Sequence, residues 1–248
     1  MRAVRLALVA LATARDYFTV LLGSWWLRRR PRRRVAFQHR VMRRWGTSLC
    51  RHLRVRWTVR GSVPEPPFLL VSNHLSYADI VVLAGLAGGS FVAKADLGDW
   101  PFLGPMCRAS DTLLIDRNTK RDLLRVGAMV EERMAAGGGV ILFAEGTTGD
   151  GSALLPFKPS LLEVAARTGR PVHWATLSYR TGADDLSPRD GVCWFGEEEF
   201  MPHFRRFSRL REIEAVITFG AEPLAGSDRK ELAARLRQAM GEVYEPTG

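Results

Sequence analysis

Cysteine is scarce in this chain of 248 residues, which contains three. Cys50, Cys107 and Cys193 lie far apart and form neither a Cys-x-x-Cys pair nor a Cys/His cluster with metal-ligand spacing. The usual sequence patterns of zinc sites and of disulfide frameworks are therefore excluded. We interpret the three side chains as reduced, buried thiols facing the cytosol, and we predict no metal site.

Acidic residues are in deficit, with 26 Asp and Glu against 36 Lys and Arg, for a net charge of +10. Such an excess of positive charge requires an anionic partner: nucleic acid, an anionic membrane, or acidic substrates such as phosphates and coenzyme A. The sequence lacks helix-turn-helix, zinc and aromatic ribonucleoprotein signatures, which counts against nucleic acid. Its length and its 46% hydrophobic residues are typical of one well-packed catalytic domain with an N-terminal appendage.

A long uninterrupted apolar run is also missing, because Arg15 and Asp16 separate two apolar runs at 6–14 and 17–27. Neither run alone spans a bilayer. A single spanning helix would place both ionisable residues near its midpoint, at roughly 2.5–3.5 kcal/mol each unless they pair or face a cavity. We therefore predict an interfacial helix or a shallow re-entrant hairpin rather than a clean crossing. No small-x-small cleavage site follows, so we expect the segment to persist.

Arginine is abundant directly after this segment, where residues 28–34 read Arg-Arg-Arg-Pro-Arg-Arg-Arg behind Trp25 and Trp26. Aromatic rings followed by cations suit an anionic cytoplasmic leaflet, each charge adding about 1 kcal/mol near the surface. A solvated basic linker or a nucleic-acid arm is the alternative, although an arm has no use for the adjacent apolar segment. We predict a second amphipathic helix over 35–53. Residues 1–54 would then anchor a peripheral or monotopic protein to the cytoplasmic face of the membrane.

From about residue 55 the chain alternates extended and helical patterns, which predicts an α/β domain over 55–248. The helical patterns cover residues 121–136, 160–168 and 228–244. The expected strands are 55–60, 68–72, 91–94, 112–116, 140–143, 172–179 and 213–219.

Polar side chains cluster where the apolar strand 68–72 runs into an apolar helix. If His74 and Asp79 were both in mid-helix, their separation would place them about 140° apart, which is poor geometry for contact. We therefore expect His74 in the turn, with Asp79 in the first helical turn reaching back to one imidazole nitrogen. A carboxylate in that position fixes the tautomer and stabilises the imidazolium, as in hydrolase triads. The alternative is that Ser76-x-x-Asp79 is only a capping box at the helix start.

Four ordered motifs together are more specific than the His-x-x-x-x-Asp spacing alone. They read Asn73-His74-x-x-x-x-Asp79, then Leu113-Leu-Ile-Asp-Arg117, then Phe143-Ala-Glu145-Gly146-Thr147, then Pro171-Val172 opening a strand. In order and spacing they resemble the four blocks of the glycerolipid acyltransferase family, which includes 1-acyl-sn-glycerol-3-phosphate (lysophosphatidic acid) acyltransferases. The resemblance covers about residues 68–180 and extends more weakly to about 220. Ala144 and Trp174 stand where the family usually has proline, which affects turn stiffness and pocket shape more than chemistry.

The resemblance implies a mixed, mostly parallel sheet flanked by helices, as in glycerol-3-phosphate acyltransferase, with an N-terminal membrane-associated helical segment. It implies that His74 is the general base and Asp79 its partner, and that the hydroxyl attacks the thioester directly without an acyl-enzyme. Arg117 and Lys94 are the implied phosphate ligands, and Glu145, Gly146 and Thr147 form a turn that contacts the acceptor. Each of these roles has a structural alternative. Arg117 would form an ordinary ion pair at the end of its strand, Lys94 would be solvated, and residues 145–147 would be a plain strand-to-loop turn.

The implied activity is that of an EC 2.3.1 enzyme of phospholipid biosynthesis. It would move a fatty acyl chain from acyl-CoA or acyl-carrier protein to 1-acylglycerol-3-phosphate, forming phosphatidic acid, with no cofactor besides that co-substrate. The expected partners are the acyl donor, a lysophospholipid and an anionic membrane surface, with no nucleic acid. Another lyso-lipid acceptor, such as a lyso-aminolipid, is the near alternative. A non-catalytic membrane-binding protein, in which His74 and Asp79 only cap a helix, is the alternative from another class.

Overall fold

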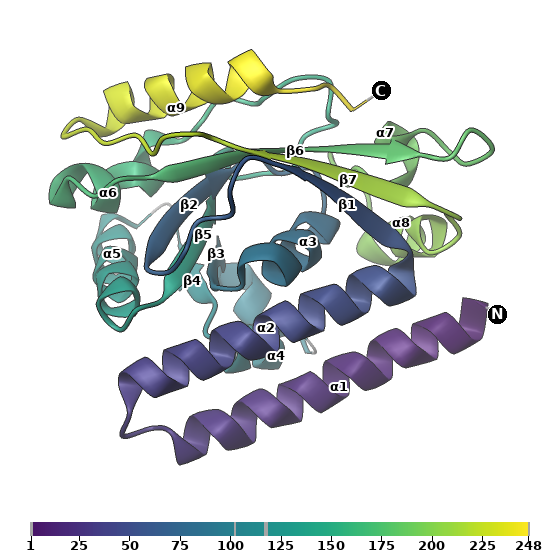
Figure 1. Cartoon of the computed structure of the whole chain (residues 1–248), viewed down its shortest axis with the longest axis horizontal. Coiled ribbons are helices and arrows are strands. Elements are labelled where there is room, and N and C mark those ends of the chain that lie inside the picture. The colour runs from purple at the N-terminus through teal and green to yellow at the C-terminus, as the bar shows by residue number, and fades with distance from the viewer. Residues whose placement is uncertain (1, 102, 117–118, 248) are drawn as a thin grey trace.

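The structure is a computed structural model that describes residues 2–101, 103–116 and 119–247. Seven strands in this part of the chain form one sheet in the order β1-β7-β6-β2-β5-β3-β4 (Figure 1). All neighbouring strands are parallel except β6 and β7, which are antiparallel. The strands are β1 Val55–Arg60, β2 Phe68–Ser72, β3 Ser90–Lys94, β4 Leu113–Ile115, β5 Gly139–Phe143, β6 His173–Thr181 and β7 Ile213–Phe219.

Helices cover both faces of this sheet. They are α1 Arg2–Trp26, α2 Pro31–Leu53, α3 Tyr77–Ala87, α4 Leu103–Ala109, α5 Lys120–Ala135, α6 Glu163–Thr168, α7 Pro188–Gly191, α8 Phe200–Phe207 and α9 Arg229–Val243, with 3₁₀ turns η1 Ala95–Asp99 and η2 Pro159–Leu162. Apolar side chains of α2, α3 and α8 form the core on one face of the sheet. Those of α5, α6 and α9 form a second core on the other face. The side chains of β2 alternate between the two cores, with Leu70 in the first and Leu69 in the second.

The predicted α/β architecture is confirmed, with a mostly parallel sheet between helices. β1, β2 and β7 have the expected bounds, and the other strands differ from their expected bounds by one or two residues at one or both ends. The helical pattern at 160–168 begins as the 3₁₀ turn η2 before it becomes α6. The predicted helix at 35–53 starts earlier, because Pro31 stands in its first turn, where a proline loses no hydrogen bond.

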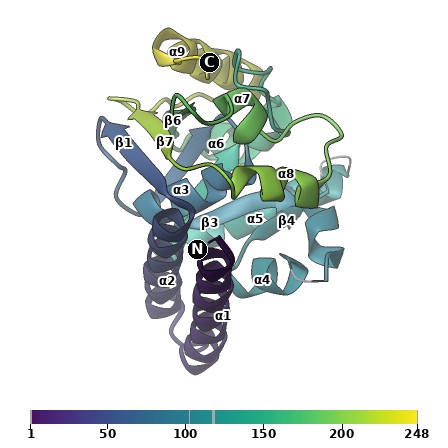
Figure 2. The same cartoon turned by 90° about the vertical axis from the view of Figure 1, so that its right-hand side faces the viewer.

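The N-terminal segment forms one continuous helix, α1, so the alternative prediction of a re-entrant hairpin within residues 6–27 is wrong. Arg15 and Asp16 do not interrupt α1 because their charges are paired. Asp16 is buried and accepts hydrogen bonds from Arg15 at 2.9 Å and from Arg44 of α2 at 3.0 Å. By length and composition alone, Ala3–Trp26 could cross a membrane. In the structure α1 lies alongside α2, as both views show (Figure 1, Figure 2).

Two glycines allow α2 to approach α3 closely. A Cβ atom added to Gly46 would lie 2.3 Å from the backbone nitrogen of Gly85 and 2.5 Å from the carbonyl oxygen of Val81. The two helix backbones therefore touch with no side chain between them. This contact fixes α3, and the first turn of α3 carries Asp79.

Candidate active site

Several predicted site residues follow the carboxyl ends of parallel strands, which meet at one edge of the sheet. His74 lies two residues after β2, Glu145 two residues after β5, and Lys94 is the last residue of β3. Ligands in open α/β sheets usually bind in the crevice at this edge. Arg117, which follows β4 in the sequence, lies outside the described residues.

His74 and Asp79 contact each other as predicted. Nδ1 of His74 lies 2.7 Å from Oδ2 of Asp79. Asp79 is fully buried, whereas the His74 side chain is 18% exposed. Because an ionised carboxylate only accepts hydrogen bonds, Nδ1 carries the proton and Nε2 keeps its lone pair. An imidazole in this tautomer can accept the proton of a hydroxyl group at Nε2.

Asp79 also caps α3, so its contact with His74 and the capping box, which the sequence offered as alternatives, occur together. Oδ2 accepts hydrogen bonds from the backbone amides of Leu75, at 2.6 Å, and Ser76, at 2.9 Å, and Ser76 completes a capping box. Oδ1 accepts a hydrogen bond from the hydroxyl of Tyr179 at 2.6 Å. The hydrogen bonds of the cap therefore hold the carboxylate of Asp79 within hydrogen-bonding distance of the imidazole of His74.

The ring of His74 stacks on Phe143, with the centroids 3.9 Å apart and the planes within 10°. Phe143 is the last residue of β5 and is buried in the first core. Together with the bond to Asp79, this stack restricts the imidazole to one orientation. Phe143 was included in the sequence-based prediction only as part of a motif, and its position two residues before Glu145 was the available signal for a role in the site.

The carboxylate of Glu145 joins two loops of the site. It is 2% exposed, and it accepts hydrogen bonds from the backbone amides of His74 and Leu155, each at 2.8 Å. Burial raises the pKa of Glu145 to about 7, and the two amide donors oppose that shift. Glu145 thus fixes the backbone of His74 as well as lying beside it.

The remaining predicted residues differ in how they are placed. The amide of Gly146 donates a hydrogen bond to the carbonyl of Phe143 at 3.2 Å, and its φ of +73° closes the turn. Thr147 is exposed on this turn. Lys94 is exposed at the end of β3, where η1 begins. A contact of Lys94 or of the turn with substrate stays a prediction.

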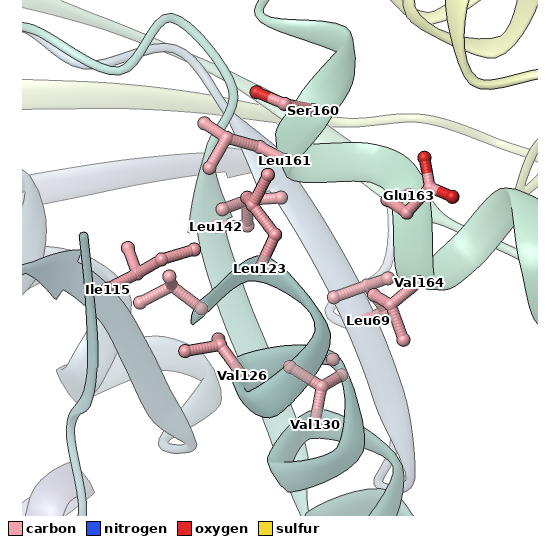
Figure 3. A pocket seen from close by; sticks show the side chains of 12 residues that line it. Leu69, Ile115, Leu123, Val126, Val130, Leu142, Ser160, Leu161, Glu163 and Val164 are labelled. Atoms are coloured by element: carbon pink, nitrogen blue, oxygen red, sulfur yellow. The ribbon is translucent and has the colours of Figure 1, made fainter. Parts of the chain in front are cut away.

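A small cavity, partly open to solvent, lies on the other side of the sheet and is not part of this site. It measures about 30 Å³ and is lined mainly by apolar side chains of α5, η2, α6 and the strands (Figure 3). Leu69 and Leu142 reach it from the second core, whereas Phe143 beneath His74 belongs to the first. A cavity of this volume holds about one or two water molecules, so it is too small for an acyl chain.

A buried carboxylate that orients a partly exposed imidazole is an arrangement that general-base enzymes use. A model of the Acyltransferase family matches residues 54–178. Lyso-ornithine lipid O-acyltransferases of Brucella abortus and Pseudomonas aeruginosa are 34% and 32% identical to the chain. They cover 91% and 82% of it, over 85% and 78% of their own lengths. A 1-acyl-sn-glycerol-3-phosphate acyltransferase of Neisseria gonorrhoeae is 33% identical over 73% of this chain and 71% of its own.

Comparison with a solved structure supports the same fold. The crystal structure of a 1-acyl-sn-glycerophosphate (LPA) acyltransferase from Thermotoga maritima superposes with a TM-score of 0.66 at 21% identity, covering 98% of each chain. The family model and the sequence relatives show that the chain belongs to the Acyltransferase family and is an enzyme of the EC 2.3.1 class. The family and the class expected from the four motifs are confirmed.

Proposed function

We propose that this acyltransferase esterifies the free hydroxyl of a lyso-lipid with a fatty acyl chain from a thioester donor, and that the acceptor is a lyso-ornithine lipid. The contact between His74 and Asp79 carries the chemical part of the proposal. Nε2 of His74 takes the hydroxyl proton while the oxygen attacks the thioester carbon. The carbon–sulfur bond breaks, the thiolate leaves and is protonated, and the products are an ester and a free thiol.

Two kinds of relative support different acceptors. The lyso-ornithine lipid acyltransferases of Brucella abortus, Pseudomonas aeruginosa and Rhizobium meliloti match 91%, 82% and 87% of this chain. This favours the lyso-aminolipid that the sequence offered as the alternative acceptor. The Neisseria relative and the four-motif resemblance favour 1-acylglycerol-3-phosphate, which is the second candidate. The two headgroups differ in chemistry, because ornithine has an amino group and no phosphate.

A panel of acceptors separates these candidates. Purified protein in detergent is given acyl-CoA or acyl-carrier protein with either lyso-lipid, and free thiol is measured. We expect a higher kcat/KM with the lyso-ornithine lipid than with 1-acylglycerol-3-phosphate. The reverse order would reject the first acceptor in favour of the second, and no release with any pair would reject the activity. His74→Ala should reduce release to a slow residual rate, whereas His52→Ala, at the end of α2, is the matched control and should leave release unchanged.

We further propose that α1 lies in the surface of an anionic membrane, at its cytoplasmic face. Large apolar side chains are exposed along the helix, among them Leu11 at 66%, Leu22 at 70% and Trp26 at 75%. The Arg-rich segment 28–34 follows directly. The opposite side of α1 contacts the polar helix α2 through the Arg44–Asp16 pair and two further hydrogen bonds, from Trp45 to Thr13 at 3.2 Å and from Gln38 to Ser24 at 3.1 Å. These contacts favour a helix that lies along the surface over one that crosses.

Labelling of single cysteines tests this orientation. Ala3→Cys and Arg29→Cys, each made in a chain whose Cys50, Cys107 and Cys193 are changed to alanine, place a single thiol near each end of α1. Both native residues are exposed. If the helix lies in the cytoplasmic surface, an impermeant maleimide labels both variants from the cytoplasmic side of sealed inverted vesicles. Labelling of the two variants from opposite sides would show that α1 crosses the bilayer.

A further inference from the structure

Among the residues that the structure describes, the buried hydroxyl of Tyr179 is the one donor to Asp79 that comes from neither the histidine turn nor the helix cap. Tyr179 lies on β6, 100 residues from Asp79 in the sequence, and 1% of it is exposed. Its hydroxyl donates a hydrogen bond of 2.6 Å to Oδ1, while the other donors all bind Oδ2. Oδ1 is the oxygen that does not face the imidazole.

Tyr179 is held in place by hydrogen bonds to its strand, the first of which comes from Asn73, the residue before His74. The side chain of Asn73 donates to the carbonyl of Leu177 at 2.9 Å and accepts from its amide at 2.7 Å. This pair joins the end of β2 to β6 two residues before Tyr179. Leu177 and Tyr179 point into the same core, as alternation along a strand requires. The amide of Tyr179 in turn donates to the hydroxyl of Thr247 at 3.2 Å.

We propose that Tyr179 is a positioning residue for the acyl transfer, acting on His74 through the carboxylate of Asp79. The inference rests on the proposed function and deepens it. A hydrogen bond at Oδ1 fixes the rotation of the carboxylate and leaves Oδ2 directed at Nδ1. It also draws negative charge away from Oδ2, so the proton stays on the imidazole ring. As Nε2 takes the hydroxyl proton, the new imidazolium faces a carboxylate whose charge and direction Tyr179 sets.

The phenol group of Tyr179 keeps its proton and can act as a hydrogen-bond donor at neutral pH. Burial and the neighbouring Asp79 charge raise the pKa of Tyr179 well above its usual value. Its proton is therefore present throughout the range in which a histidine base titrates.

Tyr179→Phe removes the hydroxyl and keeps the ring. We expect kcat to fall by about tenfold with KM little changed, as for loss of one hydrogen bond to a charged group. The acid limb of the pH–kcat profile should move to higher pH, because the carboxylate then stabilises the imidazolium more strongly. Tyr17→Phe on α1 is the matched control and should change neither quantity.

A second variant keeps the test decisive if Tyr179→Phe folds poorly. Tyr179→3-fluorotyrosine retains the hydroxyl and makes it a stronger donor, so the acid limb should move to lower pH. Limbs that coincide with wild type in both variants would overturn the inference, and so would a lower Tm with an unchanged kcat and profile. Failure of the proposed function looks different, because wild type itself would then release no thiol with any lyso-lipid.

Discussion

The carboxylate of Glu145 makes the unfolding free energy depend on pH in a direction opposite to that of most paired carboxylates. Burial raises its pKa from 4.5 to about 7 in the folded chain. Between these two values the folded state keeps a proton that the unfolded state has lost. Unfolding free energy therefore decreases as pH rises through this window. Because one pKa unit corresponds to about 1.4 kcal/mol, the full change is about 3 kcal/mol.

Glu145→Gln isolates this contribution. Glutamine stays uncharged, and its oxygen can still accept one of the two backbone amide bonds, at a cost of about 1 kcal/mol for the other. The free energy of unfolding of wild type and of the variant is measured by urea denaturation at several pH values from 4.5 to 8. Unfolding is followed by tryptophan fluorescence in one detergent. We expect wild type minus variant to fall by about 3 kcal/mol across that range, since the other groups cancel in the difference.

Glu65→Gln is the control, because Glu65 is exposed. Its difference from wild type should be flat with pH. A flat difference for Glu145→Gln as well would refute the reasoning, since it would mean that the buried carboxylate has the same pKa in the folded and unfolded chains. An increase with pH would mean that the two amide donors outweigh burial.

Three further substitutions follow from the same geometry. Asp79→Asn should lower kcat by about 10²–10⁴-fold in the thiol assay, because an amide can present its NH₂ group to Nδ1 and favour the wrong tautomer; retention of more than half the activity would count against the pair. Gly46→Ala should lower unfolding free energy by about 1–3 kcal/mol, because the new methyl group meets the backbone of Gly85, whereas Gly241→Ala, with nothing within 4 Å, should not. Asp16→Asn should lower the free energy of unfolding by about 1–3 kcal/mol, less than for a fully buried ion pair because both arginine partners are about half exposed. An unchanged denaturation midpoint would show that the ion pairs contribute nothing.

Local patterns were sufficient for much of the fold. β2 could be predicted because an apolar run is bounded by turn residues, and the turn at His74 followed from the poor mid-helix geometry of His74 and Asp79. These predictions depend on residues within a few positions of each other, where spacing limits what the backbone can do.

Contacts between distant residues could not be predicted in this way. The hydroxyl of Tyr179 reaches Asp79 only because β6 lies next to β2. The residue pattern of a single strand does not predict which strand will be its neighbour. The same holds for α1, where Arg15 and Asp16 were treated as a break in the apolar run. Their charge is compensated by Arg44 of the next helix, and a hydropathy pattern does not report such a partner.

The most direct measurement is the pH dependence of thiol release by wild type and His74→Ala, with acyl donor and lyso-lipid both saturating. If His74 is the general base, wild-type kcat falls on the acid side of the range from pH 5 to 8, and the variant shows only a slow rate without that titration. A wild-type profile that is flat over this range, or a variant with an equal rate, would contradict the account.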